Sequence, residues 1–282
     1  MLELIQAIIF GLVEGITEWL PISSTGHMIL LNEIMPLNVS DAFYSMFEVV
    51  IQLGAIMAVV VLYFRSIWPF ACQPKQPLGK RYGLQYVKKP IFDLWIKILV
   101  ACVPAAIVGL LFDETLEALF YNYVVVALAL IIFGVAFIIV EKIQKHKKPL
   151  IRSLDQLDYK TVLIIGGFQL IAAIFPGTSR SGATIVGALM LGVSRSVAAE
   201  FTFFLAIPVM AGASLLKLVK FGLAFTSSEL MILITGMVVA FITSMLIIRF
   251  LMHYIRKHDF TIFGYYRIIL GVVVLMFFGL GL

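Results

Sequence analysis

The sequence predicts an all-α polytopic membrane protein, with six full transmembrane helices and two broken re-entrant helical hairpins in an inverted-topology repeat. Of its 282 residues, 62% are hydrophobic and 13% are charged, so the chain is far more apolar than a soluble domain. Apolar runs long enough to cross a bilayer occur, and they lack β-barrel alternation, which favours helices with internally satisfied backbones. We interpret residues 1–282 as a single membrane domain.

Six apolar runs have the length of a full span. A hydrocarbon core of about 30 Å needs roughly 20 helical residues. The predicted spans are 44–64, 91–112, 119–140, 198–216, 230–252 and 262–282.

Four further apolar segments are too short to span comfortably, and they form two pairs. The first pair is 3–20 and 21–34, and the second is 161–175 and 181–193. Pro21 and Gly26 interrupt the first pair, and the stretch PGTSRSG at 176–182 interrupts the second. The alternative is that proline and glycine kink ordinary helices, but both breaks are rich in polar residues.

The two breaks resemble each other at a fixed distance along the chain. A shift of 155 positions places Pro21 on Pro176 and Ser24 on Ser179. Together with the charge asymmetry, this predicts inverted repeats at approximately 1–112 and 155–252. In such repeats the broken tips meet near the midplane of the membrane and form a site there.

Basic residues are concentrated in two loops, which predicts the orientation of the spans. Segments 65–90 and 142–158 are rich in lysine and arginine, whereas the turn 113–118 carries acids and no base. The positive-inside rule places both basic loops in the cytoplasm and the acidic turn outside. The net charge of +5 follows from these loops and fits contact with membrane lipids, not with nucleic acid.

Glu14 and Glu18 are the first candidate site residues. They are four residues apart, so on a helix their carboxylates share one face. A buried carboxylate needs a cation, a metal ion, a proton or water. The pair suits a divalent cation such as Mg²⁺ or Ca²⁺, and a titrating pair in a proton-coupled transporter is the alternative.

The stretch PISSTGH at 21–27 supplies hydroxyls and an imidazole. Ser23, Ser24 and Thr25 offer hydroxyl groups, and His27 has an unperturbed pKa near neutrality. A hydroxyl next to an imidazole is a nucleophile with its base, and the imidazole can also activate water. Each residue taken alone is more often structural, and the cluster favours chemistry.

Arg180 indicates that the ligand is a phosphate. An arginine at membrane depth needs an anionic partner, and its planar guanidinium binds phosphate at two points. Thr178, Ser179 and Ser181 surround it at the start of a helix, where free backbone N–H groups bind anions. An internal ion pair between Glu14 and Arg180 is the structural alternative.

Three motifs resemble the undecaprenyl-diphosphate phosphatase family of the bacitracin-resistance type. They are EGITEWLPISSTGHM at 14–28, FEVVIQLGAIMAVV at 47–60 and FPGTSRSGATI at 175–185. The resemblance covers nearly the whole chain, with the motifs in the family's order. It implies active-site positions at Glu14, Glu18, Ser24, His27, Ser179 and Arg180, with nearby polar residues Ser23, Thr25 and Gln52.

The resemblance also implies a bacterial inner-membrane enzyme with its site open to the outside. The implied reaction hydrolyses undecaprenyl diphosphate to the monophosphate and inorganic phosphate, aided by a divalent cation. The attacking group remains open among Ser24, His27 and water. The alternative function is a lipid-carrier flippase or secondary transporter, because inverted repeats are a transporter architecture. A homodimer is a possible partner state.

Overall fold

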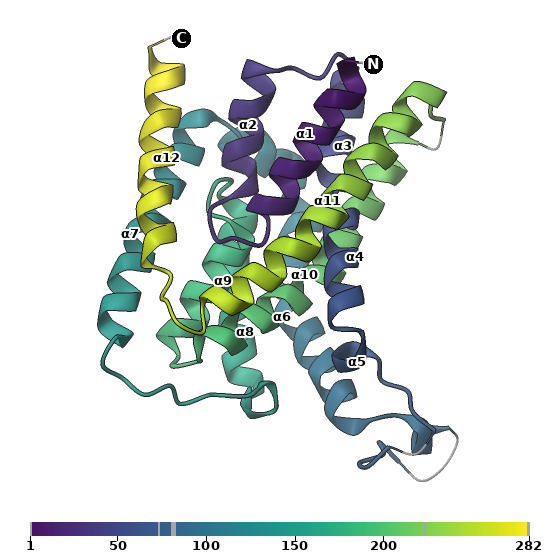
Figure 1. The fold of residues 1–282 in the computed structure, drawn as a ribbon, viewed down its shortest axis with the longest axis vertical. Coiled ribbons are helices and arrows are strands. Elements are labelled where there is room, and N and C mark those ends of the chain that lie inside the picture. Colours follow the sequence, from purple (N-terminus) through teal and green to yellow (C-terminus); the bar gives the residue numbers. More distant parts are fainter. Residues whose placement is uncertain (1, 73, 80–82, 223, 281–282) are drawn as a thin grey trace.

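The computed structural model describes residues 2–72, 74–79, 83–222 and 224–280 (Figure 1). In this part of the chain the regular elements are helices, as expected. Six of them have the length and composition of membrane spans: Asp41–Leu62, Lys89–Phe112, Tyr123–Gln144, Arg195–Phe221, Ser227–Tyr254 and Thr261–Gly279. The six predicted spans are therefore confirmed, with differences at two of them.

The first span consists of two helices, α3 (Asp41–Val50) and α4 (Gln52–Leu62), which meet at Ile51. The second span begins a longer helix, α6 (Lys89–Phe120). Our prediction of a turn at 113–118 was wrong, because this stretch lacks glycine and proline and continues α6. The helix ends before Asn122, whose Oδ1 accepts a bond from Val125 N at 3.0 Å. Asn122 thus caps α7 (Tyr123–Gln144).

The two short pairs are α1 (Leu2–Thr17) with α2 (Ser24–Ile34), and α8 (Tyr159–Ile174) with α9 (Arg180–Met190). Their helices have 16 or 11 residues, short of the roughly 20 that a span needs. The predicted breaks are present, and their loops lie at mid-height of the molecule (Figure 1). Their re-entrant course in a membrane stays a prediction.

Equivalent serines start the second helix of each pair. Ser23 accepts from Gly26 N at 3.4 Å, and Ser179 accepts from Gly182 N at 3.1 Å. They have φ angles of 74° and 67° and are the two non-glycine residues with positive φ in the described chain. These caps are 156 positions apart, so the shift of 155 was wrong by one residue here. Ser24 corresponds to Arg180.

The first helix of each hairpin packs on a long helix from the other half of the predicted repeat. Helix α1 packs on α11 (Ser227–Tyr254), and α8 packs on α6. The contacts are close: a Cβ added to Gly15 would lie 2.6 Å from Thr243 Cβ, and one added to Gly166 would lie 2.4 Å from Ala101 O. Each hairpin is thus anchored on a helix of the other half. The inverted repeats remain a prediction that this packing supports.

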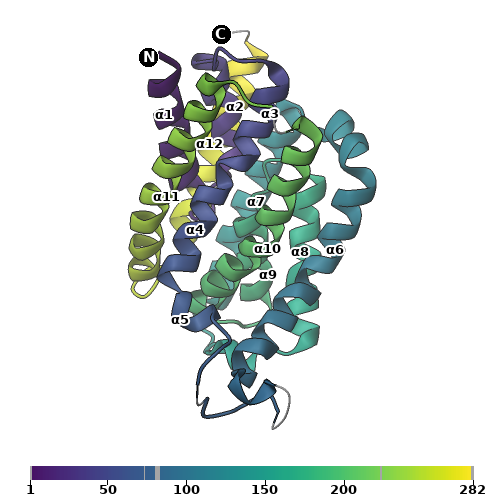
Figure 2. The same ribbon diagram turned by 90° about the vertical axis from the view of Figure 1, so that its right-hand side faces the viewer.

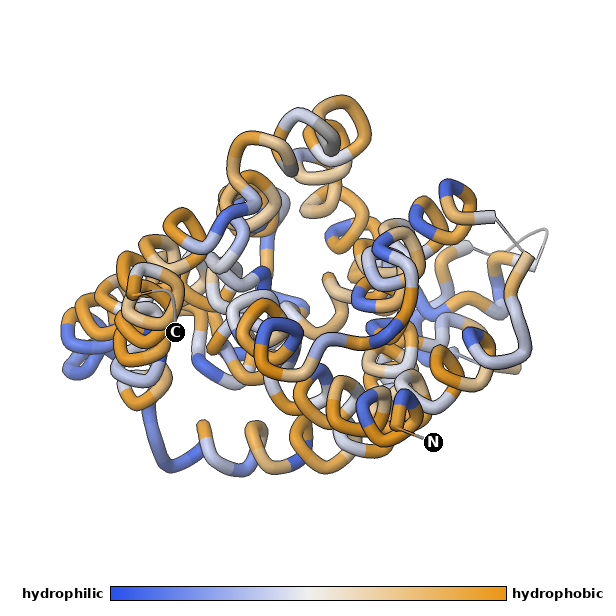
Figure 3. The backbone as a smooth tube through the Cα atoms, turned by 90° about the horizontal axis from the view of Figure 1, so that it is seen from above, coloured by the Kyte–Doolittle hydropathy of each residue, from blue (hydrophilic) through white to orange (hydrophobic). Residues whose placement is uncertain are grey.

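The last spans are α10 (Arg195–Phe221) and α12 (Thr261–Gly279), and α12 packs along α7. The loops after α5 (Phe64–Ile67) and α7 lie at one end of the molecule, and the start of α1 and end of α12 lie at the other (Figures 1 and 2). Both basic loops therefore share one end. Viewed along the bundle, the helices are predominantly hydrophobic (Figure 3), as expected for surfaces that face lipid.

Candidate functional site

The two breaks contact each other through Glu18, which follows the end of α1. Ser181 Oγ donates to Glu18 O at 3.0 Å, and Arg180 Nη2 donates to Glu18 Oε1 at 2.7 Å. Both partners start α9, 162 residues or more along the chain. The two breaks therefore meet, as predicted, and they do so at Glu18, Arg180 and Ser181.

Both carboxylate oxygens of Glu18 have partners. Ser24 Oγ donates to Oε2 at 2.8 Å while Arg180 holds Oε1. Arg180 Nη1 also donates to Thr202 O at 3.0 Å. The alternative pair between Arg180 and Glu14 was wrong, since the arginine pairs with Glu18. A hydroxyl, a carboxylate and a guanidinium are thus linked by hydrogen bonds across the two breaks.

His27 is not bonded to these three groups and has other partners. Its Nδ1 is 2.8 Å from Ser23 O, and its Nε2 is 2.7 Å from Tyr266 Oη. Because a carbonyl can only accept, Nδ1 carries the hydrogen in the neutral ring and Nε2 accepts from the phenol. The rings of His27 and Tyr266 stack at 5.6 Å with 8° between their planes. The structure therefore pairs Ser24 with Glu18 and not with His27.

Glu14 is 1% exposed, and its Oε1 has no hydrogen-bond partner in the structure. Glu18, Glu48 and the cation Arg180 lie close enough to interact with it electrostatically. An unpartnered carboxylate oxygen among other acids fits a divalent cation. The described residues contain no group of three or more acids, histidines or cysteines arranged for a metal, and within them Glu14 and Glu18 are the two carboxylates that we expected to bind one.

The other predicted phosphate ligands have mixed surroundings. Ser23 and Ser179 act as helix caps, and Ser179 Oγ is 3.1 Å from Ser181 Oγ. Thr178 is 0% exposed, and its Oγ1 has no partner. No hydrogen bond in the described structure links Thr25 or Gln52 to the residues around Glu18; both are half-buried.

Two residues of α12 contact the breaks and were missed as site residues. Tyr266 bonds His27, and Arg267 donates to Gly177 O and Thr178 O at 3.0 and 2.7 Å. An arginine inside the predicted span 262–282 is a local signal that could have pointed to Arg267. Nothing local identifies the partners of either residue, because these are far away in the sequence.

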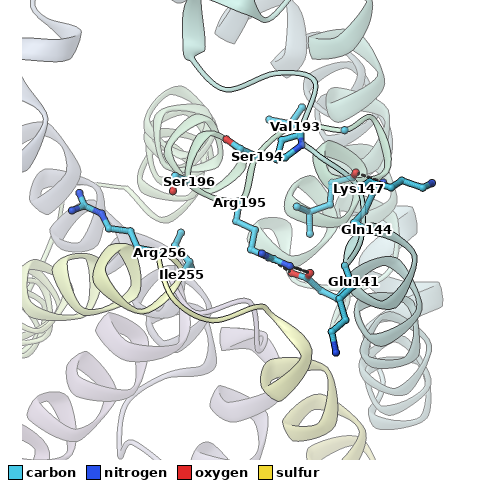
Figure 4. A pocket seen from close by; sticks show the side chains of 13 residues that line it. Glu141, Gln144, Lys147, Val193, Ser194, Arg195, Ser196, Ile255 and Arg256 are labelled. Carbon is cyan, nitrogen blue, oxygen red and sulfur yellow. Dashed lines mark hydrogen bonds and ion pairs between the residues drawn. The ribbon is translucent and has the colours of Figure 1, made fainter.

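A second arginine–glutamate pair lies at the end of the molecule that carries the basic loops. Arg195 contacts both oxygens of Glu141 at 2.5 to 3.1 Å, beside a pocket of about 330 Å³ (Figure 4). Phe260 N donates to Glu141 Oε1 at 3.0 Å. Figure 4 shows the Lys147 and Arg256 side chains extending away from this pair. The pair joins α7, α10 and the start of α12.

Two polar helix breaks that meet between apolar spans define a multi-pass membrane protein with a site suited to an anionic group. The family model described as "Bacitracin resistance protein BacA" matches residues 7–273. The chain belongs to this family.

Curated relatives match over nearly the whole chain, and each is named undecaprenyl-diphosphatase. The protein from Desulfitobacterium hafniense is 61% identical over 278 residues, covering 99% of this chain and 97% of the relative. The protein from Acetivibrio thermocellus is 60% identical, covering 99% and 98%. One from Enterococcus faecalis is 54% identical, covering 98% and 97%.

Proposed function

We propose that this protein hydrolyses undecaprenyl diphosphate to undecaprenyl phosphate and inorganic phosphate, and so recycles the lipid carrier of cell-wall synthesis. Family membership and the relatives at 54–61% identity support the activity. The main structural observation that supports this site is the position of Glu18, which is bonded to both the Ser24 hydroxyl and the Arg180 guanidinium.

Arg180 exchanges partners when the substrate binds. In the structure Arg180 forms an ion pair with Glu18. A diphosphate offers more negative charge in the two-point geometry that a guanidinium prefers. Once Arg180 turns to phosphate, Glu18 Oε1 loses its partner, while Oε2 still accepts from the Ser24 hydroxyl and can take its proton. Substrate binding thereby frees Glu18 from Arg180 while it stays beside the Ser24 hydroxyl.

Ser24 then attacks the terminal phosphorus. Its proton passes to Glu18, a bond forms between Ser24 Oγ and phosphorus, and the bond to the bridging oxygen breaks, releasing undecaprenyl phosphate. Water next attacks the phosphorus of the phosphoserine, the bond between phosphorus and Ser24 Oγ breaks, and Glu18 returns its proton to Ser24 Oγ. One water proton stays on the released phosphate and the other leaves to solvent. Arg180 offsets the charge on the transferring oxygens.

A divalent cation is part of the proposal. The unpartnered Glu14 Oε1 supports a ligand there. Glu18 Oε1 would be the second ligand once Arg180 leaves it, while Glu18 Oε2 stays next to Ser24 Oγ. A bound Mg²⁺ or Ca²⁺ would supply positive charge against the phosphate oxygens.

We further propose the bacterial inner membrane as the location, with the site open to the outer face and the isoprenoid tail among membrane lipids. The position of both basic loops at one end supports this orientation. Cys72 is exposed in the first of these loops, so a membrane-impermeant maleimide should reach it in opened cells and not in intact ones. The homodimer stays a prediction.

Phosphate release by purified protein tests the function against the flippase or transporter alternative. In detergent, where no gradient exists, the protein should release phosphate from undecaprenyl diphosphate, and Ser24→Ala should not. Substrate labelled with ³²P at the terminal phosphate should leave label on the wild type after an acid quench, and none on Ser24→Ala. Absence of phosphate release by wild type contradicts the proposal, and release with no phosphoserine contradicts Ser24 as the attacking group.

A further inference from the structure

Arg267 belongs to α12, outside both hairpins, yet it contacts the backbone of both breaks. Nη2 donates to Gly177 O and Thr178 O, and Nη1 donates to Pro21 O at 3.4 Å. The side chain is 0% exposed, and the structure pairs it with no carboxylate in the part of the chain that it describes. Its partners are thus three carbonyl groups from two loops.

This arrangement serves two needs at once, although Arg267 Nε itself has no hydrogen-bond partner. Helix breaks leave carbonyl groups without helical partners, and the low-dielectric interior offers little water to replace them. A buried guanidinium is costly unless its N–H groups are bonded. Its planar set of five donors reaches several carbonyls from one position, whereas an ammonium group is a compact point charge that cannot span both loops.

The surrounding packing fixes where the guanidinium lies. A Cβ added to Gly182 would lie 2.8 Å from Arg267 Nη1, and the Phe133 ring centre is 5.9 Å from Arg267 Cζ. Helix α12 is held against α7 by a close approach, since a Cβ on Gly264 would lie 2.7 Å from Gly134 O. The arginine is therefore mounted on a rigid helix pair.

We propose that Arg267 is a positioning residue, which holds the break carrying Glu18 and Ser24 at a fixed distance from the break carrying Arg180. It acts through backbone carbonyls and does not touch the substrate. Tyr266, the preceding residue, contacts the first break at His27. This inference rests on the proposed phosphatase function, because it assigns Arg267 to the geometry of that site.

Steady-state kinetics separate positioning from substrate binding. Since a misplacement of about 1 Å can cost about 100-fold in rate, Arg267→Lys should lower kcat by about that factor. KM should change by less than about threefold, because Arg180 is still present to bind phosphate. Arg249→Lys, an exposed position on α11, is the matched control and should retain wild-type kcat.

A second variant keeps the arginine and moves it. Gly182→Ala should displace the guanidinium and reproduce the loss in kcat, whereas Gly167→Ala, where a new Cβ meets nothing within 4 Å, should not. If Arg267→Lys does not fold, the kcat of Gly182→Ala tests the positioning role of Arg267 instead. Wild-type kcat in either variant overturns the proposal.

Hydrogen–deuterium exchange gives a readout that does not depend on activity. In Arg267→Lys, exchange should become faster in segments 18–26 and 176–182 together, while the α6–α8 contact keeps its protection. If wild type releases no phosphate, the proposed function fails, and this measurement still tests whether Arg267 joins the breaks. Unchanged exchange in both segments overturns that role.

Discussion

The two arginine–glutamate pairs differ in how completely they are bonded. At the breaks, Arg180 makes one contact with Glu18, whose second oxygen accepts from Ser24. At the other end, Arg195 grips both oxygens of Glu141, which also accepts from Phe260 N. The first pair joins the tips of two hairpins, and the second joins the ends of long helices.

This difference indicates different roles for the same residue types. Glu141 is bonded at both oxygens by Arg195 and also by a backbone N–H, so leaving this pair would cost several hydrogen bonds at once. The pair therefore suits a structural role, in which it holds helices together. Arg180 can gain a two-point partner by leaving Glu18 for phosphate. The number of bonds around each glutamate thus separates the exchangeable pair from the fixed one.

The largest expected effect is from Arg180→Lys. Lysine keeps the charge and loses the planar geometry, so we expect a loss of about 2–4 kcal/mol in transition-state stabilisation, or about 30- to 900-fold in kcat/KM. The melting temperature should change little. Arg195→Lys is the matched control and should retain kcat/KM. A fully active Arg180→Lys would contradict the phosphate role of Arg180.

Glu14→Gln should lower activity by at least about 10- to 100-fold. This is the usual loss when a residue that only orients a metal ligand is changed, and the loss of a ligand itself should be no smaller. The residual activity should no longer depend on added Mg²⁺ or Ca²⁺. Stability should not fall, because the change removes a buried carboxylate oxygen that lacks a partner. Chelator titration and thermal unfolding measure the two effects. Wild-type activity that still responds to chelator would exclude Glu14 as a ligand.

Arg195→Met should cost stability and not catalysis. Removing one member of a buried pair costs about 3–5 kcal/mol, and we expect about 2–3 kcal/mol here because the Arg195 side chain is 34% exposed and partly screened by solvent. The rate per folded molecule should stay at the wild-type level. A lowered kcat at a temperature where the variant is folded would show that this pair also serves the site.

Much of the fold could be predicted from the sequence, and the pairing within the site could not. Span length and the Pro–Gly interruptions are local signals, so the spans and both breaks were found. Arg180 and its partner Glu18 are 162 residues apart in the sequence, so their pairing depends on how the two hairpins pack together. The sequence alone could not show whether Glu14 or Glu18 is the partner. Tyr266 and Arg267 lie in an ordinary apolar span, where sequence gives no indication of their targets.

The predicted shift between the two breaks was wrong by one residue, because it was chosen to align Pro21 with Pro176 and not to align the starts of the helices that follow. The loop before Ser23 holds 18–22, and the loop before Ser179 holds 175–178, so no single shift aligns both the helices and their caps. Backbone conformation identifies the true equivalents, since Ser23 and Ser179 share a positive φ.

The smallest expected effect concerns these two caps. Each serine accepts a bond from the N–H three residues ahead, so alanine should cost about 1 kcal/mol of stability by removing it. Glycine also removes the bond, but it adopts a positive φ without strain, so it should cost only about a few tenths of a kcal/mol. Alanine should therefore be worse than glycine at both positions. Thermal unfolding of the four single variants in one detergent measures this order. If glycine proved as costly as alanine at Ser179 alone, then the hydroxyl contact with Ser181, and not backbone conformation, would dominate at the second break.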